Sequence, residues 1–164
     1  MTASERQRLI ARYTAGYQCI VDALKGIAPD ELDFRPAPAE WSAREIVHHL
    51  ADSETISGQR LRQLLVQDNA RIQGYDQEEY ARRLDYQRRP LEPALRAFEA
   101  ARASTAQLFD QMTDADWQRA GMHSESGPYS ATTWLQIYAE HAEAHAEQIQ
   151  KNRAAWMARR SESR

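Results

Sequence analysis

The chain has 164 residues, of which 42% are hydrophobic and 27% are charged, which suits one globular domain with a sizeable core and excludes a disordered chain. A formal net charge of −3 argues against a general nucleic-acid-binding protein, which normally presents a basic face. No apolar run is long enough to cross a bilayer, and the first residues lack a signal peptide's apolar segment. We therefore expect a cytoplasmic protein with a single domain over residues 1–164 that binds neither nucleic acid nor membrane.

Apolar residues at helical spacing predict a first helix over residues 4–25, which Gly26 ends. Cys19 lies within this pattern and has no second cysteine to pair with, so we interpret it as a small core residue, with a reactive thiol as the alternative. Residues 30–38 form a proline-containing connection. The second helix is predicted over 42–67, because Ser42 and Glu45 form a capping box at its start.

Residues 68–89 form a long connection with a short helix at 77–84. The third helix begins after Pro90, and its apolar stripe extends to Met112. One further turn is expected at 114–118 and a loop at 121–128, before Ser130 caps a fourth helix that continues to about residue 158. Residues 159–164 are expected to form a frayed tail. With no convincing strand, the pattern predicts an all-α four-helix bundle with a long connection between its second and third helices.

His141 and His145 are the most informative residues for function. They lie four apart on the stripe that should face the interior, so their imidazoles are about one helical turn apart and can converge on one ion. A histidine pair at this spacing is a weak motif by itself, and satisfied core histidines remain an equal alternative. A third ligand is needed to make the metal site persuasive.

Two adjacent histidines in the second helix are candidates for that third ligand. His48 shares a polar stripe with Arg44 and Asp52, which indicates the solvated face. His49 lies instead with Ile46 and other apolar residues on a face that we expect to be buried. The predicted metal ligands are therefore His49, His141 and His145, and three imidazoles would leave an open position for water or substrate.

Other polar residues near these positions have both a functional and an ordinary interpretation. Asp52 lies one turn from both histidines of the second helix and can orient a ligand imidazole, or it is a surface charge. His123, in the predicted loop before the fourth helix, is either an acid or base or a solvent-facing residue. Arg60 is too far along the helix to reach the metal, and we expect a structural ion pair with an acid of residues 68–89.

The segment from Trp41 to Glu54, with the pair His141 and His145 near the C-terminus, resembles the DinB/YfiT-like superfamily of bacterial metalloproteins. The likeness spans most of the chain and is greatest to the YfiT branch of metal-dependent hydrolases. It implies a four-helix bundle that binds a divalent ion, zinc or nickel, through His49, His141 and His145. Glu54 departs from the YfiT branch, where we would expect another histidine.

The resemblance also implies a homodimer and a small-molecule substrate. Relatives include thiol S-transferases that use low-molecular-weight thiols such as bacillithiol or mycothiol. The leading hypothesis is thus a metal-dependent enzyme that hydrolyses a small molecule or transfers a thiol, with its catalytic acid and base unknown. The alternatives are a non-catalytic metal-binding or stress-response bundle, and a plain dimeric scaffold with internally satisfied histidines.

Overall fold

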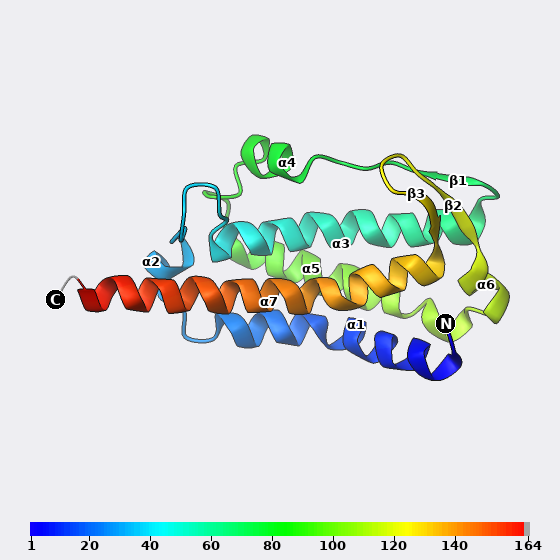
Figure 1. Ribbon diagram of the computed structural model, residues 1–164, viewed down its shortest axis with the longest axis horizontal. Coiled ribbons are helices and arrows are strands. Elements are labelled where there is room, and N and C mark those ends of the chain that lie inside the picture. Colours follow the sequence, from blue (N-terminus) through cyan, green and yellow to red (C-terminus); the bar gives the residue numbers. More distant parts are fainter. Residues whose placement is uncertain (163–164) are drawn as a thin grey trace.

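Four long helices run side by side along most of the molecule (Figure 1). The computed structural model describes residues 1–162, and its long helices are α1 (Ala3–Leu24), α3 (Ala43–Val66), α5 (Leu91–Ala106) and α7 (Ala131–Glu162). Helix α1 packs on α7, and α3 packs on both α5 and α7. The predicted all-α four-helix bundle is therefore confirmed. None of the helices within residues 1–162 has an apolar stretch long enough to cross a bilayer.

The start of α3 follows from its sequence. The Ser42 hydroxyl accepts a hydrogen bond from the Glu45 backbone N–H at 3.3 Å, and the Glu45 carboxylate accepts one from the Ser42 N–H at 2.9 Å. This reciprocal capping box satisfies two donors that a helix N-terminus leaves unpaired. It confirms the predicted start and fixes the helical phase of His49.

The long connection between α3 and α5 is also confirmed. It carries β1 (Ala70–Ile72) and α4 (Gln77–Arg83) back along the outer side of α3, so that α3 and α5 run in the same direction (Figure 1). We call residues 67–90 the strap. Three short elements complete the helical part: α2 (Pro29–Leu32), the 3₁₀ turn η1 (Phe109–Gln111) and α6 (Asp114–Gln118).

The sequence did not reveal a small sheet at one end of the bundle. Strand β2 (Ala120–His123) pairs in parallel with β1 and antiparallel with β3 (Gly127–Ser130). The prediction of a loop at 121–128 is therefore wrong. Gly121 permits the parallel pairing, because a Cβ there would lie only 2.2 Å from the Ala70 carbonyl oxygen. Gly127 supplies the left-handed backbone of the hairpin turn with a φ of 77°.

Two helix ends differ from the prediction. Helix α5 stops at Ala106 and does not reach Met112, because the chain turns into η1 there. Helix α7 continues to Glu162, so residues 159–162 are helical and do not form the expected frayed tail. The other two residues of that predicted tail, 163 and 164, lie outside the described part of the chain.

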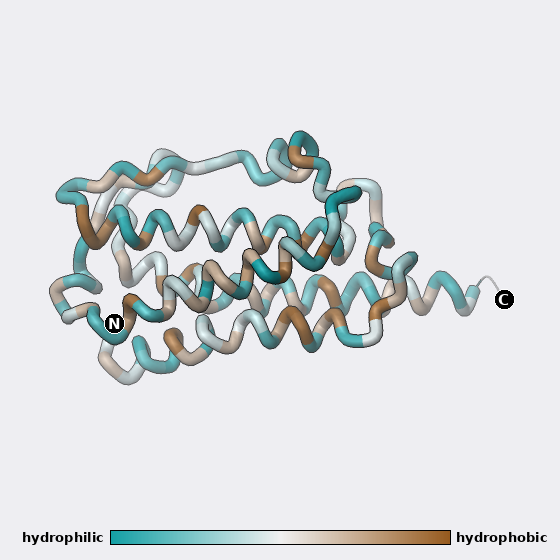
Figure 2. The backbone as a smooth tube through the Cα atoms, turned by 180° about the vertical axis from the view of Figure 1, so that it is seen from behind, coloured by the Kyte–Doolittle hydropathy of each residue, from teal (hydrophilic) through white to brown (hydrophobic). Residues whose placement is uncertain are grey.

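The buried side chains form two apolar clusters along the bundle, and hydrophobic segments alternate with hydrophilic ones along each long helix (Figure 2). One cluster lies nearer the start of α3 and includes Ile20, Ile46, Leu50, Phe98 and Ile149. The other lies nearer the sheet and includes Tyr13, Leu61, Leu64, Trp134 and Leu135. Along α3 and α5 the buried side chains between the two clusters are polar: Ser53, Glu54, Ser57, Arg60, Arg102 and Thr105.

Candidate metal centre

The three histidines predicted as ligands come together in the structure. The Nε2 atom of His141 lies 3.3 Å from Nε2 of His49 and 3.2 Å from Nε2 of His145. One nitrogen from each of the three rings lies within 4.8 Å of the other two. Helix α3 supplies the first ring, and consecutive turns of α7 supply the other two, so the packing of α3 on α7 assembles the cluster.

The two nitrogen–nitrogen distances from His141 fit a shared ion. Zinc–nitrogen bonds of 2.0–2.1 Å in tetrahedral geometry place ligand nitrogens about 3.3 Å apart. The contacts of His141 with the other two rings are 3.2 and 3.3 Å long. A single proton on the shared Nε2 atom of His141 can serve only one of these contacts as a hydrogen bond. A cation at the meeting point would satisfy all three nitrogens together.

The outer nitrogens of the two α7 rings have different surroundings. Nδ1 of His145 donates to Oε1 of Gln148 at 2.9 Å, which leaves the Nε2 lone pair directed at the cluster. Nδ1 of His141 is buried and has no hydrogen-bond partner within residues 1–162. Gln148 is the acceptor that sequence reasoning missed, although it follows His145 by three residues and so lies on the same face of the helix.

Burial keeps the three imidazoles neutral. Desolvation lowers the pKa of His49 to about 3, and the neighbouring His145 contributes to this shift. Desolvation also lowers the pKa of His145, and it lowers that of His141 well below its ordinary value. Neutral imidazole is the form that binds metals, so the cluster is ready to coordinate at neutral pH.

Trp41 packs against the His49 ring and fixes its position. The two ring centroids are 4.9 Å apart. The indole N–H of Trp41 donates to Glu78 of α4 at 3.2 Å, and its carbonyl accepts from Asn152 of α7 at 2.8 Å. The strap and α7 thus hold the same tryptophan, which forms one wall of the cluster.

Asp52 lies outside the cluster. Its carboxylate accepts a hydrogen bond from the Tyr86 hydroxyl at 2.6 Å, and an Arg89 nitrogen lies 3.9 Å away. Within residues 1–162, no hydrogen bond joins Asp52 to a histidine. The carboxylate holds the strap against α3, and the hydrogen bond that orients a ring of the cluster comes from Gln148.

His48 is buried, which corrects the prediction of a solvated ring. The strap covers the face of α3 that carries His48. The His48 Nε2 donates to the Arg89 carbonyl at 3.1 Å, and its ring stacks on Tyr86. Only 1% of His48 is exposed. The His48 ring contacts the strap, while the His49 ring faces α7 and joins the cluster. The structure thus brings His49, the ring selected by helical phase, to the two histidines of α7.

His123 also lies apart from the three-histidine cluster, on β2. Its Nδ1 accepts the backbone N–H of Glu125 at 3.2 Å and of Ser126 at 3.4 Å, and its ring packs on Tyr129. The side chain therefore shapes the hairpin turn between β2 and β3.

Comparison with known sequences identifies the family. Residues 12–149 match the sequence profile of the DinB superfamily. The chain belongs to the DinB superfamily.

Individual relatives of this DinB chain carry similar names. An Oceanobacillus iheyensis protein named "Putative metal-dependent hydrolase" is 32% identical over 120 residues, which cover 73% of this chain and 69% of the relative. A Geobacillus thermodenitrificans protein of the same name is 27% identical, covering 94% of this chain and 90% of the relative. Bacillus subtilis YfiT, described as "a probable metal-dependent hydrolase with an unusual four-helix bundle topology", superposes with a TM-score of 0.87. At 20% identity, covering 93% of this chain and 87% of YfiT, that likeness shows the shared fold.

Glu54 of the DinB chain has a structural partner. Its carboxylate accepts from Arg102 of α5 at 2.7 Å and from the Tyr13 hydroxyl of α1 at 2.7 Å. Arg102 also donates to the carbonyl oxygens of Tyr13 and Tyr138. The residue that departs from the YfiT pattern thus links all four long helices through one buried network.

Arg60 does not form the ion pair that we predicted. Its Nη1 donates to the Tyr138 hydroxyl at 3.1 Å and its Nη2 to the Gln73 carbonyl at 2.8 Å. Within residues 1–162 no carboxylate pairs with its guanidinium. The strap supplies a backbone carbonyl at this point, and sequence patterns do not specify such a contact.

Proposed function

We propose that the chain is a divalent-metal-dependent enzyme that hydrolyses a small molecule, with His49, His141 and His145 holding zinc or nickel. The observation that carries the proposal is the convergence of three neutral ring nitrogens, with His141 Nε2 at 3.3 and 3.2 Å from the other two. A divalent ion held by three imidazoles supplies activation of water, or of a thiol, near neutral pH. The names of the relatives support hydrolysis as the leading reaction.

Aromatic and hydroxyl side chains surround the cluster. Trp41 forms one wall, and the Tyr138 ring forms another at 5.7 Å from the His141 ring centroid. Ser53 lies one turn beyond His49 and is 4% exposed, with the hydroxyls of Tyr75 and Tyr138 close to it. Burial raises the pKa of both tyrosines, so their hydroxyls stay protonated and can donate to a substrate oxygen.

Metal content tests the first half of the proposal. Untagged protein loaded with zinc or nickel and then desalted should hold one ion per chain by plasma mass spectrometry. A His141→Ala variant should lose that ion, because the shared Nε2 is gone. The matched control is His123→Ala, which removes a histidine outside the cluster and should keep the ion. Absence of a retained ion in the unsubstituted protein would overturn the proposal.

Turnover tests the second half. A panel of activated esters and amides, with and without cellular thiols, should show hydrolysis that depends on the metal and disappears in His141→Ala. Turnover that requires a low-molecular-weight thiol would assign the chain to the S-transferases. Stoichiometric metal binding with no turnover across the panel would favour a non-catalytic metal-binding bundle.

We further propose that the protein is a homodimer, on the family resemblance alone. Light scattering on the purified protein should give twice the mass of the 18.8 kDa chain. A monomeric mass would overturn this part without affecting the metal site.

A further inference from the structure

Arg60 is a buried cation without a counter-ion. Only 8% of the residue is exposed, and within residues 1–162 no carboxylate lies within ion-pair distance of it. Its Nε–H is buried and has no hydrogen-bond partner in the same part of the chain. Burial of an unpaired charge is costly, so such a group calls for a physical explanation.

Arg102 is a second buried arginine of the bundle, and its charge and hydrogen-bond donors are fully paired. Arg102 is 3% exposed, and its guanidinium binds the Glu54 carboxylate and the carbonyls of Tyr13 and Tyr138. All three of its nitrogens have partners. Both arginines contact Tyr138: Arg102 donates to the Tyr138 carbonyl, and Arg60 donates to the Tyr138 hydroxyl. Of the two, only Arg102 is paired with a carboxylate within residues 1–162.

The surroundings of Arg60 are rich in neutral donors. The Tyr138 hydroxyl is one, and the Tyr75 ring adds a cation–π contact, with its centroid 5.8 Å from the Arg60 guanidinium carbon. The Tyr129 hydroxyl is buried beside Arg60 and Tyr138 without a hydrogen bond of normal geometry to either. The Glu54 carboxylate acts on Tyr138 and the Asp52 carboxylate on Tyr75, but within residues 1–162 neither pairs with Arg60. Buried donors around one positive charge that lacks an ion-pair partner form a site suited to an oxyanion.

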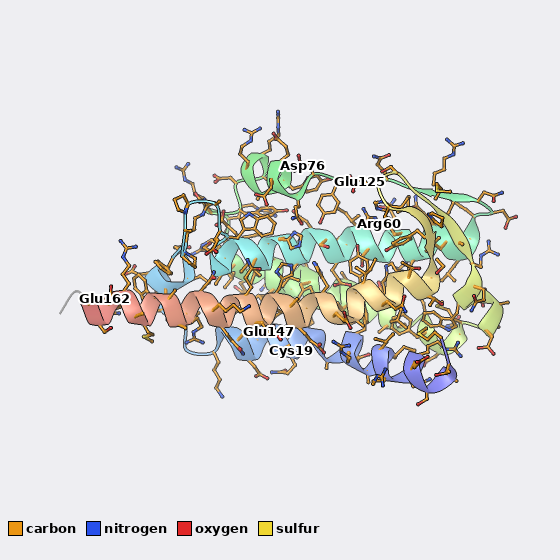
Figure 3. All side chains as sticks on the ribbon, in the orientation of Figure 1. Cys19, Arg60, Asp76, Glu125, Glu147 and Glu162 are labelled. Carbon is orange, nitrogen blue, oxygen red and sulfur yellow. The ribbon has the colours of Figure 1, made fainter. Side chains whose placement is uncertain are left out.

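This group of donors adjoins the histidine cluster. Tyr138 precedes His141 by one turn of α7 and connects the two, since its ring contacts the His141 ring and its hydroxyl accepts from Arg60. Arg60 itself lies on the side of α3 that faces the strap and the β2–β3 hairpin (Figure 3). An anion at Arg60 would therefore lie beside the three-histidine cluster and not within it.

We propose that Arg60, with the Tyr138 and Tyr129 hydroxyls, binds an anionic oxygen group of the substrate, a carboxylate or a phosphate, beside the metal centre. That the anion belongs to a substrate rests on the proposed function, but the anion site itself does not require a bound metal. The unused Nε–H and the charge of Arg60 supply the attraction, and the two hydroxyls complete the oxyanion's hydrogen bonds. Substrates would then combine a reactive group at the histidines with an anionic group at Arg60, which makes Arg60 a specificity-determining residue.

The direct test follows the Arg60 Nε–H in metal-free protein by ¹H–¹⁵N NMR. Sodium acetate and inorganic phosphate are titrated separately at constant ionic strength, with sodium chloride as the reference. The Nε–H signal of Arg60, assigned by its loss in Arg60→Lys, should shift saturably with acetate, with phosphate or with both. The probe that saturates at lower concentration identifies the preferred class of anion.

Substitutions then localise the effect. Because the Nε–H signal is absent once Arg60 is replaced, isothermal titration calorimetry compares the affinity for the saturating anion among the variants. A charged hydrogen-bonded pair is lost in Arg60→Gln, so its affinity should fall by about tenfold or more. Arg60→Lys keeps the charge but not the fork of donors, and should retain part of the affinity. Arg71→Gln, which changes an exposed arginine of β1, should bind as the unsubstituted protein does.

Either of two results would overturn the proposal: an Arg60 signal that moves no more with acetate or phosphate than with chloride, or equal anion affinity in Arg60→Gln. Both results are obtained on folded, metal-free protein. They are therefore independent of the metal-content measurement, whose failure would remove the proposed function and leave the anion site standing.

Discussion

Arg102 and Glu54 form an ion pair in the interior of the bundle, with Nη1 of the arginine 2.7 Å from Oε2 of the glutamate. The two side chains are 3% and 0% exposed. The pair joins α5 to α3, and the remaining donors of Arg102 reach carbonyls on α1 and α7. The polar layer between the two apolar clusters is therefore held together by one arginine.

Replacing Arg102 by methionine should destabilise the protein severely. The substitution leaves Glu54 buried without its cation, and breaking a buried pair in this way costs about 3–5 kcal/mol. Urea denaturation followed by circular dichroism measures the loss. The control is Arg96→Met on the same helix, whose partner Glu92 is 78% exposed, and it should change stability by less than about 1 kcal/mol. Similar losses in the two variants would contradict the role assigned to Arg102.

Gly16→Ala should reverse the usual effect of that substitution in a helix. Alanine normally stabilises a helix by about 1 kcal/mol relative to glycine. Here the added Cβ would lie 2.7 Å from Nη2 of Arg102 and 2.8 Å from Cβ of Ala142. We expect a net loss of about 1–3 kcal/mol from overpacking. Thermal denaturation measures it, and the exposed neighbouring change Ala15→Gly gives the propensity effect alone. A higher melting temperature for Gly16→Ala would show that α1 and α7 are not in close contact there.

Gln148→Leu should weaken metal binding without removing a ligand. The glutamine accepts the Nδ1 proton of His145 at 2.9 Å, and loss of such a partner typically lowers metal affinity about 10–100-fold. Competition with a coloured chelator measures the affinity. Gln150→Leu, at an exposed position of the same helix, should bind the ion as tightly as the unsubstituted protein. Unchanged affinity in Gln148→Leu would mean that the ring of His145 is oriented by other contacts.

The β2–β3 turn should open as the pH falls. Burial and the charge of Arg60 lower the pKa of His123, while Glu125 opposes the shift. The folded state therefore binds fewer protons than the unfolded state below the ordinary histidine pKa of 6.5, so this residue's contribution to stability falls as the pH drops through that range. Protonated Nδ1 also cannot accept the N–H groups of Glu125 and Ser126. An NMR titration should place the His123 midpoint below 6.5, with the amide signals of Glu125 and Ser126 moving at the same midpoint. A midpoint above this value would refute the prediction.

The helices and the positions of the three histidines could be predicted because both depend on local, periodic signals. The capping box at Ser42 sets where α3 begins, and the helical phase from there directs His49 toward α7. The four-residue spacing of His141 and His145 does the same on α7. These features need only the geometry of a single helix.

The sheet and the strap could not be predicted, because their contacts join residues far apart in the chain. Strand β1 has three residues and pairs in parallel with β2 about fifty residues later, too short a segment to show alternation. The burial of His48 could not be predicted either, because nothing in its own helix shows that the Arg89 carbonyl covers its ring. The Gln73 carbonyl at Arg60 is likewise a backbone group, which side-chain patterns do not reveal.

A crystal structure of metal-loaded protein, with anomalous diffraction recorded at the zinc or nickel edge, tests the central claim most directly. We predict one strong anomalous peak per chain between α3 and α7, bonded to Nε2 of His49, His141 and His145. A peak elsewhere, or three histidine rings that keep their hydrogen bonds with no ion among them, would contradict it.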